Sequence, residues 1–236
     1  MAKLFAGTSG FAYATWKPDF YPEKLAAKKF LNYYAQRLNA VEINYTFRRL
    51  PSASTLENWV AETPDGFTFV VKAHMRITHL LRLAPSEFYE VFFRAIDPLR
   101  VKGRLGPVLF QLQPNFAKDV ARLDAFLKEV PEDVRCAFEF RNKTWLSEDV
   151  YEVLERYKVA LCLAESDKLT IPHRITAGFV YFRLRKPEYS AAEREEIAAK
   201  VKALLAEGKD TYVFFKHEDT PAGAMYAEEL IRAEVG

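Results

Sequence analysis

The 236-residue chain is 50% hydrophobic and 28% charged, and its basic and acidic residues almost balance, at a formal net charge of +2. This composition is typical of a globular protein with a sizeable core. The small net charge argues against general binding to nucleic acids or membranes, so any basic patch must be local.

Short apolar runs alternate with amphipathic segments along the chain, and in the first half these runs predict strands that are each followed by a helix. The strands are expected at 3–9, 40–46 and 67–74, and the helices at 25–38, 52–62 and 86–100. Pro51 and Ser52 mark the start of the second helix.

The alternation continues in the second half. Strands are expected at 106–112, within 136–145, and at 159–164, 178–184 and 211–217, and helices at 119–129, 147–157, 191–207 and 221–233. Ser147 is expected to cap one helix, and Thr220 with Pro221 to begin the last one. The segment 167–175 is short and poorly periodic, with room for one turn of helix.

Eight strand–helix units of roughly thirty residues each match the period of a βαβ unit. We therefore predict an α/β protein, a single (β/α)8 TIM barrel over residues 1–236 with an irregular unit after the sixth strand. An open doubly wound sheet is the alternative, but no GxGxxG motif follows the first strand. No linker-like stretch divides the chain, which favours one domain.

The two cysteines, Cys136 and Cys162, lie inside apolar runs and lack the spacing of a zinc or redox site. We expect buried free thiols in a reducing cytoplasm. The N-terminus lacks the hydrophobic region of a signal peptide, and no apolar run is long enough to span a bilayer. A cytoplasmic protein is expected.

The fifth strand carries two ionised groups on one face, because residues two apart on a strand point the same way. Glu139 and Arg141 therefore share one face, and Phe138 and Phe140 share the other. Such groups are costly in a core unless they are paired or belong to a site. The pair lies at the end of its strand, where barrel enzymes place their catalytic groups.

Nearly every predicted strand ends in polar residues at the same spacing. Six of these residues are expected to face one interior: Glu42, Lys72, Gln111, Glu139, Arg141 and Arg183. Asn44 shares the parity of Glu42 and is a further candidate for ligand binding. A single buried ion pair is more often scaffold than catalyst, but polar side chains from almost all strands predict a lined cavity.

The loops after the last two strands are candidates for an anion site, as in many barrels. They supply Arg183, Arg185 and Lys216, next to the expected start of the last helix. A plain helix start beside surface cations is the alternative. Several aromatic residues near the mouth are candidates to stack on a sugar or a base: Tyr13, Trp16, Phe20, Tyr45 and Trp145. The alternative for several of them is that they only cover the end of the barrel.

Two mechanisms fit these residue types. In the first, Glu139 or Glu42 is a general base, and Lys72 or His79 polarises a carbonyl or hydroxyl group in proton-transfer or isomerase chemistry. A Schiff base on Lys72 is a variant of it.

In the second mechanism a divalent cation, manganese, magnesium or zinc, is held by Glu42, His79, Glu139 and Glu165. The nearby cations argue against a tightly held metal. The metal-free mechanism is therefore favoured, and no cofactor is predicted.

The order of motifs along nearly the whole chain resembles the YecE-like family, domain-of-unknown-function family seventy-two. The motifs are Gly7-Thr8-Ser9-Gly10-Phe11 with Tyr13 and Trp16, Phe20-Tyr21-Pro22, Val41-Glu42-Ile43-Asn44, Thr46-Phe47, Leu50-Pro51, 69–72, Thr78-His79, 106–111, Glu139-Phe140-Arg141, Trp145, Tyr181 and Arg183. The resemblance implies a TIM barrel related to sugar isomerases, and a nucleic-acid role has also been suggested for the family.

The chain departs from the family pattern in several places. Tyr45 stands where serine is usual and Arg48 where tyrosine is usual. The sixth strand ends in Ala164-Glu165-Ser166 where an aspartate is typical, which puts a metal or proton role there in doubt. Lys216-His217-Glu218 replaces paired asparagines and adds charge beside the expected anion site.

The sequence thus predicts an enzyme, isomerase- or hydrolase-like, that acts on a small polar, anionic or sugar-like ligand, such as one containing phosphate or sugar, by carboxylate acid/base chemistry. The alternatives are a nucleic-acid-binding or processing protein that uses the same mouth, and a barrel that binds a ligand without catalysis. No membrane partner is expected.

Overall fold

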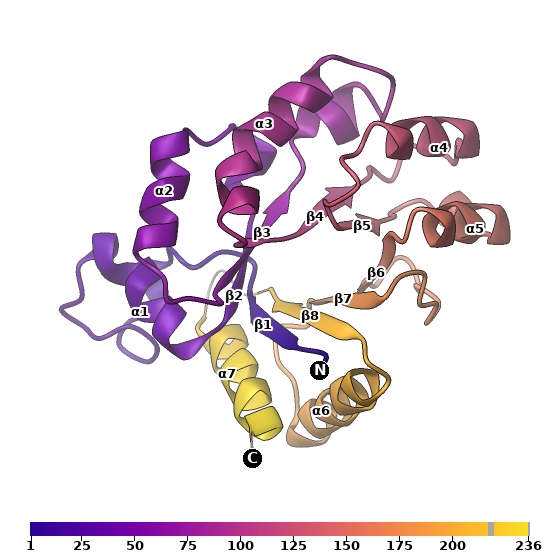
Figure 1. Ribbon diagram of the computed structural model, residues 1–236. Coiled ribbons are helices and arrows are strands. Elements are labelled where there is room, and N and C mark those ends of the chain that lie inside the picture. The colour runs from indigo at the N-terminus through magenta and orange to yellow at the C-terminus, as the bar shows by residue number, and fades with distance from the viewer. Residues whose placement is uncertain (217–219, 236) are drawn as a thin grey trace.

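The computed structural model describes residues 1–216 and 220–235 and consists of a barrel of eight parallel strands surrounded by helices (Figure 1). The strands are β1 (Leu4–Thr8), β2 (Ala40–Ile43), β3 (Thr68–Lys72), β4 (Leu105–Gln111), β5 (Cys136–Glu139), β6 (Ala160–Ala164), β7 (Phe179–Leu184) and β8 (Asp210–Phe215). Each strand pairs in parallel with the next along the chain from β2 to β8, and β8 returns to β1. The predicted (β/α)8 fold class is confirmed.

Helices cover the outside of the barrel between successive strands. They are α1 (Phe30–Arg37), α2 (Ala53–Ala61), α3 (Phe88–Val101), α4 (Val120–Lys128), α5 (Glu148–Arg156), α6 (Ala191–Ala206) and α7 (Ala222–Val235). Residues 165–178, between β6 and β7, form no helix, so the irregular unit lies where the weak periodicity indicated. None of the described helices is long and apolar enough to cross a bilayer.

Side-chain caps begin several helices as the local sequence requires. Ser52 and Asp119 accept hydrogen bonds from the backbone N–H three residues later. Ser147 precedes α5 but does not cap it, because its hydroxyl donates to Asp149 and the Asp149 carboxylate accepts from the N–H of Val150. Ser147 therefore occupies the predicted N-cap position but makes no capping hydrogen bond with its side chain.

At the C-terminal end of the chain, α7 begins at Ala222, one residue after the predicted start at Pro221. The predicted end of the eighth strand at His217, and Glu218 beyond it, lie outside the described residues.

The barrel closes between β1 and β2 through side chains more than through a strand ladder. Their backbone pairing is a single bridge between Ser9 and Glu42. The Tyr34 hydroxyl accepts from the N–H of Thr8 (2.8 Å) and donates to the carbonyl of Ala40 (3.0 Å). The strands meet here so closely that a Cβ atom on Gly7 would lie 1.9 Å from the Ala40 oxygen, which explains a glycine at this position.

Replacing Tyr34 by phenylalanine is expected to lower the free energy of unfolding by about 1–3 kcal/mol, because it leaves buried backbone groups at the seam without their partner. Urea denaturation measures the change. Tyr45→Phe is the matched control, since the Tyr45 side chain is 48% exposed. An equal loss of unfolding free energy in Tyr34→Phe and Tyr45→Phe would contradict the stabilising role of the Tyr34 hydroxyl between β1 and β2.

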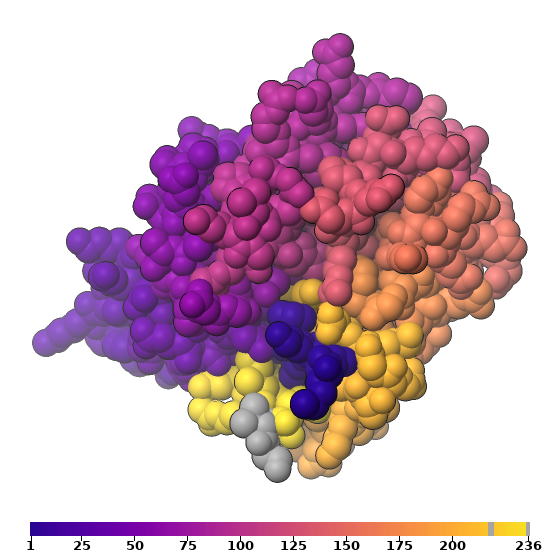
Figure 2. All heavy atoms as spheres, viewed as in Figure 1, coloured from indigo at the N-terminus to yellow at the C-terminus, as the bar shows by residue number. Residues whose placement is uncertain are grey.

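The core has two layers, inside and outside the strands. A small cluster within the barrel combines alanines with large aromatic residues, among them Tyr181, Tyr212 and Phe214. The outer layer packs the opposite strand faces against the helices. Side chains fill the spaces between the ribbons, and the indigo N-terminal residues lie beside the orange and yellow last third of the chain (Figure 2). Strand parity therefore decides which side chains reach the interior.

Candidate functional site

The fold brings six of the predicted polar residues together inside the C-terminal end of the barrel. This mouth cluster consists of Glu42, Lys72, Gln111, Glu139, Arg141 and Arg183. Its lower members are buried: the exposed fractions of Glu42, Glu139 and Arg183 are 0%, 3% and 4%. Lys72 is half-buried and Arg141 is more exposed. The cluster therefore has cations toward the mouth and, below them, a buried ion-pair network formed by Glu42, Glu139 and Arg183.

Arg183 of β7 holds the two buried carboxylates together. Its Nε and Nη2 atoms donate to the two carboxylate oxygens of Glu42, at 2.9 and 2.7 Å. Its Nη1 atom donates to Glu139 Oε2 at 2.5 Å. The planar guanidinium suits this forked geometry, which a lysine could not reproduce. The side chain that was a candidate anion ligand thus serves two internal carboxylates.

Glu42 receives two further hydrogen bonds. The hydroxyl groups of Ser9 and Tyr181 donate to its two oxygens, each at 2.7 Å. Sequence reasoning did not select these residues for the site. The position of Tyr181, two residues before Arg183 on the same strand face, was the available signal.

Glu139 ends β5 and also accepts a hydrogen bond from Arg141 Nε, at 3.0 Å. Its burial raises the pKa of the carboxyl group, but the positive charges of Arg183 and Arg141 outweigh burial and lower this pKa to about 2. A group with so low a pKa is a weak proton acceptor at neutral pH. The electrostatics therefore do not favour Glu139 as the general base.

Lys72 ends β3 and lies between a polar and an aromatic neighbour. Its ammonium group donates to Gln111 Oε1 at 2.8 Å and lies 4.2 Å from the centre of the Phe47 ring. No carboxylate among the described residues lies within ion-pair distance of it. Burial, followed by the charge of Arg183, lowers the pKa of Lys72 to about 8.

His79 lies above Lys72 in a π-helical turn, Arg76–Leu80. Its Nδ1 atom is 2.8 Å from the Thr78 hydroxyl, and its ring packs edge-on against Phe47. Burial and then the positive charge of Lys72 lower the pKa of His79. The imidazole is therefore mainly neutral at pH 7.

Asn44 and Tyr13 lie half-buried near the mouth. The Tyr13 hydroxyl donates to the Ser9 carbonyl at 2.9 Å. The Oδ1 atom of Asn44 is a buried acceptor, and none of the described residues donates a hydrogen bond to it. A ligand hydroxyl group would satisfy such an acceptor.

The two tryptophans expected near the mouth are core residues. Trp16 is fully buried and packs against Phe20 and Tyr21. Trp145 is also fully buried, stacks on Phe140 and donates from Nε1 to the carbonyl of Phe116 at 2.7 Å. Neither can stack on a ligand, because both side chains are fully buried. For Trp145, strand parity turns Phe140, and Trp145 with it, to the outer layer. The prediction that the two tryptophans stack on a ligand is corrected.

The four candidate metal ligands Glu42, His79, Glu139 and Glu165 do not form a metal site. Within 1–216 and 220–235, no three histidine, cysteine, aspartate or glutamate side chains are placed to hold one ion. The guanidinium of Arg183 occupies the position between Glu42 and Glu139 that a cation would need. This proposed ligand set is corrected.

Glu165 follows β6 and is engaged by the loop after β7. Its Oε2 atom accepts from the N–H groups of Arg185 (2.6 Å) and Lys186 (3.3 Å) and from the hydroxyl of Tyr189. This carboxylate therefore anchors a loop and does not enter the mouth cluster.

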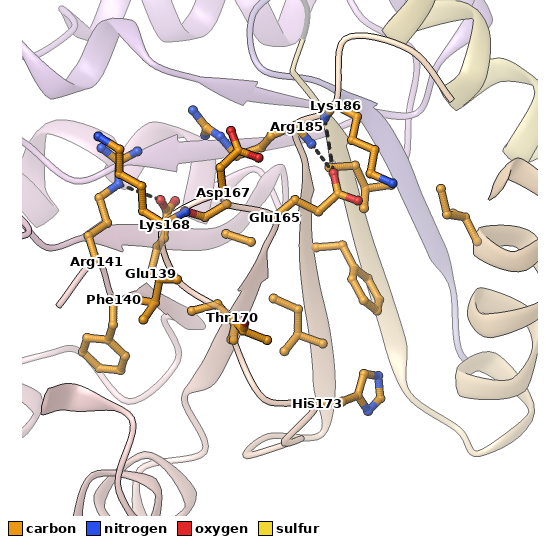
Figure 3. A pocket seen from close by; sticks show the side chains of 18 of the residues that line it. Glu139, Phe140, Arg141, Glu165, Asp167, Lys168, Thr170, His173, Arg185 and Lys186 are labelled. Carbon is orange, nitrogen blue, oxygen red and sulfur yellow. Dashed lines mark hydrogen bonds and ion pairs between the residues drawn. The ribbon is translucent and has the colours of Figure 1, made fainter. Parts of the chain in front are cut away.

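The other predicted anion ligands remain near the mouth. Lys216 follows β8 and is half-buried. Arg185, two residues beyond Arg183, lines a cavity of about 830 Å³ together with Glu139 and Arg141. In Figure 3 the charged side chains gather at one end of this cavity, and His173 lies toward the other.

Comparison with known proteins gives a match over almost the whole chain. The sequence model of a family described as "Protein of unknown function DUF72" matches residues 5–235. The UPF0759 protein YunF of Bacillus subtilis (strain 168) is 36% identical over 142 residues, which are 57% of this chain and 50% of that protein. The alignment thus spans about half the length of that curated relative.

Two solved structures extend the likeness to the full fold. A DUF72 family protein from Thermotoga maritima MSB8 is 29% identical, with a TM-score of 0.86 over 99% of this chain and 100% of that one. Another from Enterococcus faecalis V583 is 18% identical, with a TM-score of 0.80 over 100% and 99% of the two chains. At 18% identity, the similarity to the Enterococcus faecalis structure shows a shared fold alone.

Proposed function

The chain belongs to the DUF72 family, a family of unknown function with a TIM-barrel fold, and we propose that it is an enzyme that transfers a proton on a small anionic, sugar-like ligand bound at the barrel mouth. Lys72 is the proposed proton carrier. Arg141 and Arg185 are proposed to bind the anionic group of the ligand, and Asn44 a hydroxyl group.

The observation that carries this proposal is the environment of Lys72. Its pKa of about 8 leaves about one tenth of the amine neutral at pH 7, whereas an ordinary lysine is neutral in about one molecule in 2,500. A catalytic acid or base works best when its pKa lies near the operating pH. Among the residues of the mouth cluster, Lys72 meets this condition better than Glu139, whose pKa is about 2.

The charges around Lys72 favour an anionic ligand. Glu42 and Glu139 are already neutralised by Arg183 and Arg141. The positive charges of Lys72 and Arg185 are in excess, since neither has a carboxylate partner within the described residues. A phosphate or carboxylate group would offset them.

The carboxylates are proposed as positioning residues. They hold the guanidinium of Arg183 in place; the charge of Arg183 lowers the pKa of the Lys72 amine, whereas the charges of the two carboxylates raise it. In the proposed reaction, the neutral amine of Lys72 takes a proton from the carbon next to a ligand carbonyl. The resulting ammonium group returns the proton to the former carbonyl carbon, while the proton of the hydroxyl group on the first carbon passes to the former carbonyl oxygen. The carbonyl group thereby moves to the neighbouring carbon, which is an isomerisation.

Trace labelling with acetic anhydride at pH 7, followed by peptide mass spectrometry, tests the state of Lys72. We expect Lys72 to react at least about tenfold faster than the exposed Lys102 and Lys202, because acylation requires the neutral amine. Orthophosphate should slow the reaction at Lys72 and leave the two control lysines unchanged. Equal rates at all three residues would contradict the proposal.

A further inference from the structure

The missing helix between β6 and β7 leaves space on the outside of the barrel. In most units a helix covers the outer strand face, but the described segment 165–178 crosses this region as an irregular loop. The cavity of about 830 Å³ lies here, between the loop and α6, and it reaches the mouth over the ends of β6 and β7. This volume lies within the range of cavities that enclose small molecules.

The outer part of the cavity is apolar. Leu163, Phe182 and Leu184 have the strand parity that points away from the barrel interior, and they form one wall. Ile197 and Val201 of α6 line the cavity as well. In a complete unit, such side chains would be covered by a helix.

The inner part of the cavity is charged, and it shares Glu139 and Arg141 with the mouth cluster (Figure 3). The Nε atom of Arg141 is bonded to Glu139, while its side chain stays 40% exposed. Basic residues outnumber acidic ones in the lining: Arg141, Lys168, Arg185, Lys186 and Lys200 against Glu139, Glu165 and Asp167.

Arg185 is the cation whose surroundings most clearly require an anion. It is half-buried, and no carboxylate of the described residues lies within ion-pair distance of its guanidinium. The nearby Glu165 carboxylate is occupied by the loop backbone and Tyr189. Burial, followed by the charge of Arg183, lowers the pKa of Arg185, and the opposing charge of Glu139 does not offset them, so an added negative charge would be stabilising.

We propose that the ligand of this protein is an amphipathic anion, with a phosphate or carboxylate head group on Arg185 and Arg141 and an apolar chain or ring on Leu163, Phe182 and Leu184. The proposal rests on the proposed function and specifies its ligand class. The head group would lie beside the mouth cluster, and the apolar part would occupy the place of the missing helix.

Calorimetric titration with orthophosphate and with butyl, hexyl and octyl phosphate tests this assignment. Each methylene group that is fully buried adds about fourfold in affinity, so we expect at least about a tenfold gain from butyl to octyl phosphate. Octyl glucoside, which has the chain without the charge, should bind at least about tenfold more weakly than octyl phosphate.

Substitutions at the charged end and at the apolar end of the cavity test the two parts of the ligand separately. Arg185→Gln should weaken all the phosphates about tenfold or more, whereas Arg94→Gln, at an exposed site on α3, should change nothing. Ile197→Glu should abolish the gain from chain length and leave orthophosphate unaffected. Ile171→Glu, on the loop, provides the same test if the first variant does not fold.

The outcomes distinguish this inference from the proposed function. If orthophosphate binds and slows the labelling of Lys72 but chain length has no effect, the amphipathic ligand is excluded and the anion site remains. Chain-dependent binding that Arg185→Gln does not change would reflect nonspecific apolar adhesion and would also overturn the inference. If no phosphate binds, both proposals fail.

Discussion

Replacing Arg183 by methionine is expected to lower the free energy of unfolding at pH 7 by about 3–5 kcal/mol, because it leaves two buried carboxylates without their counterion. Glu42 and Glu139 are 0% and 3% exposed, so water cannot take over the role of the guanidinium. The measurement is urea denaturation at pH 7 and at pH 5.

Between pH 7 and pH 5, the stability of this variant should depend on pH, whereas the contribution of Glu139 to the native protein should not change. In the native protein the folded-state pKa of Glu139 is about 2, below the ordinary value of 4.5. Its stabilising contribution is therefore present above pH 4.5 and is lost as the pH falls toward 2. Without Arg183, burial dominates and raises the folded-state pKa of Glu139, so the variant should gain stability between pH 7 and pH 5.

The triple variant Glu42→Gln, Glu139→Gln, Arg183→Met is the control for this prediction. It removes the charges together, so it should recover most of the stability lost in the single variant. If the single variant were as stable as the native protein and had the same pH dependence, the buried ion-pair network of Glu42, Glu139 and Arg183 would not be formed.

Replacing Lys72 by methionine is expected to reduce catalysis by ~10²–10⁴-fold, the usual contribution of a positioned acid or base. The probe is dihydroxyacetone phosphate, which combines an anionic group with exchangeable protons next to a carbonyl. Proton NMR in D₂O follows the exchange. Because the neutral amine is the active form, the native rate should rise with pH up to the Lys72 pKa of about 8 and then level off.

Lys102→Met, at an exposed position, is the matched control and should retain the native rate. The methionine at position 72 keeps the length of the side chain and breaks no ion pair within the described residues, so its thermal unfolding should stay close to that of the native protein. Exchange at the native rate in Lys72→Met, or no exchange by the native protein, would contradict the proposed reaction.

The periodicity of the sequence was sufficient to predict the barrel. Apolar runs and amphipathic segments are local patterns, and eight of them in alternation leave few arrangements other than a closed parallel sheet. The weak pattern at 167–175 also indicated an irregular unit, although the turn of helix for which it left room is not formed. The strand parity placed Glu42, Glu139 and Arg183 on one face, because alternation along a strand requires no knowledge of its neighbours.

The sequence alone did not determine how these residues pair. Whether Arg183 binds a ligand or two carboxylates depends on distances across the barrel, which arise only when β2, β5 and β7 close around it. The pKa values of Glu139 and Lys72 depend on the same distances and on burial. From the sequence, Glu139 was the preferred candidate for the base; the lowered pKa of Glu139 and the pKa of about 8 of Lys72 are the reason that Lys72 is proposed in its place.

The positions of the aromatic residues near the mouth also could not be predicted from the sequence alone. Trp16 and Trp145 belong to irregular segments after strands, where spacing does not reveal direction, and the fold turns both into the core. The sequence by itself thus determined the architecture and the set of polar side chains at the mouth. Only the tertiary structure decided their pairing, their charge states and the cavity beside them, because each depends on contacts between residues far apart in the chain.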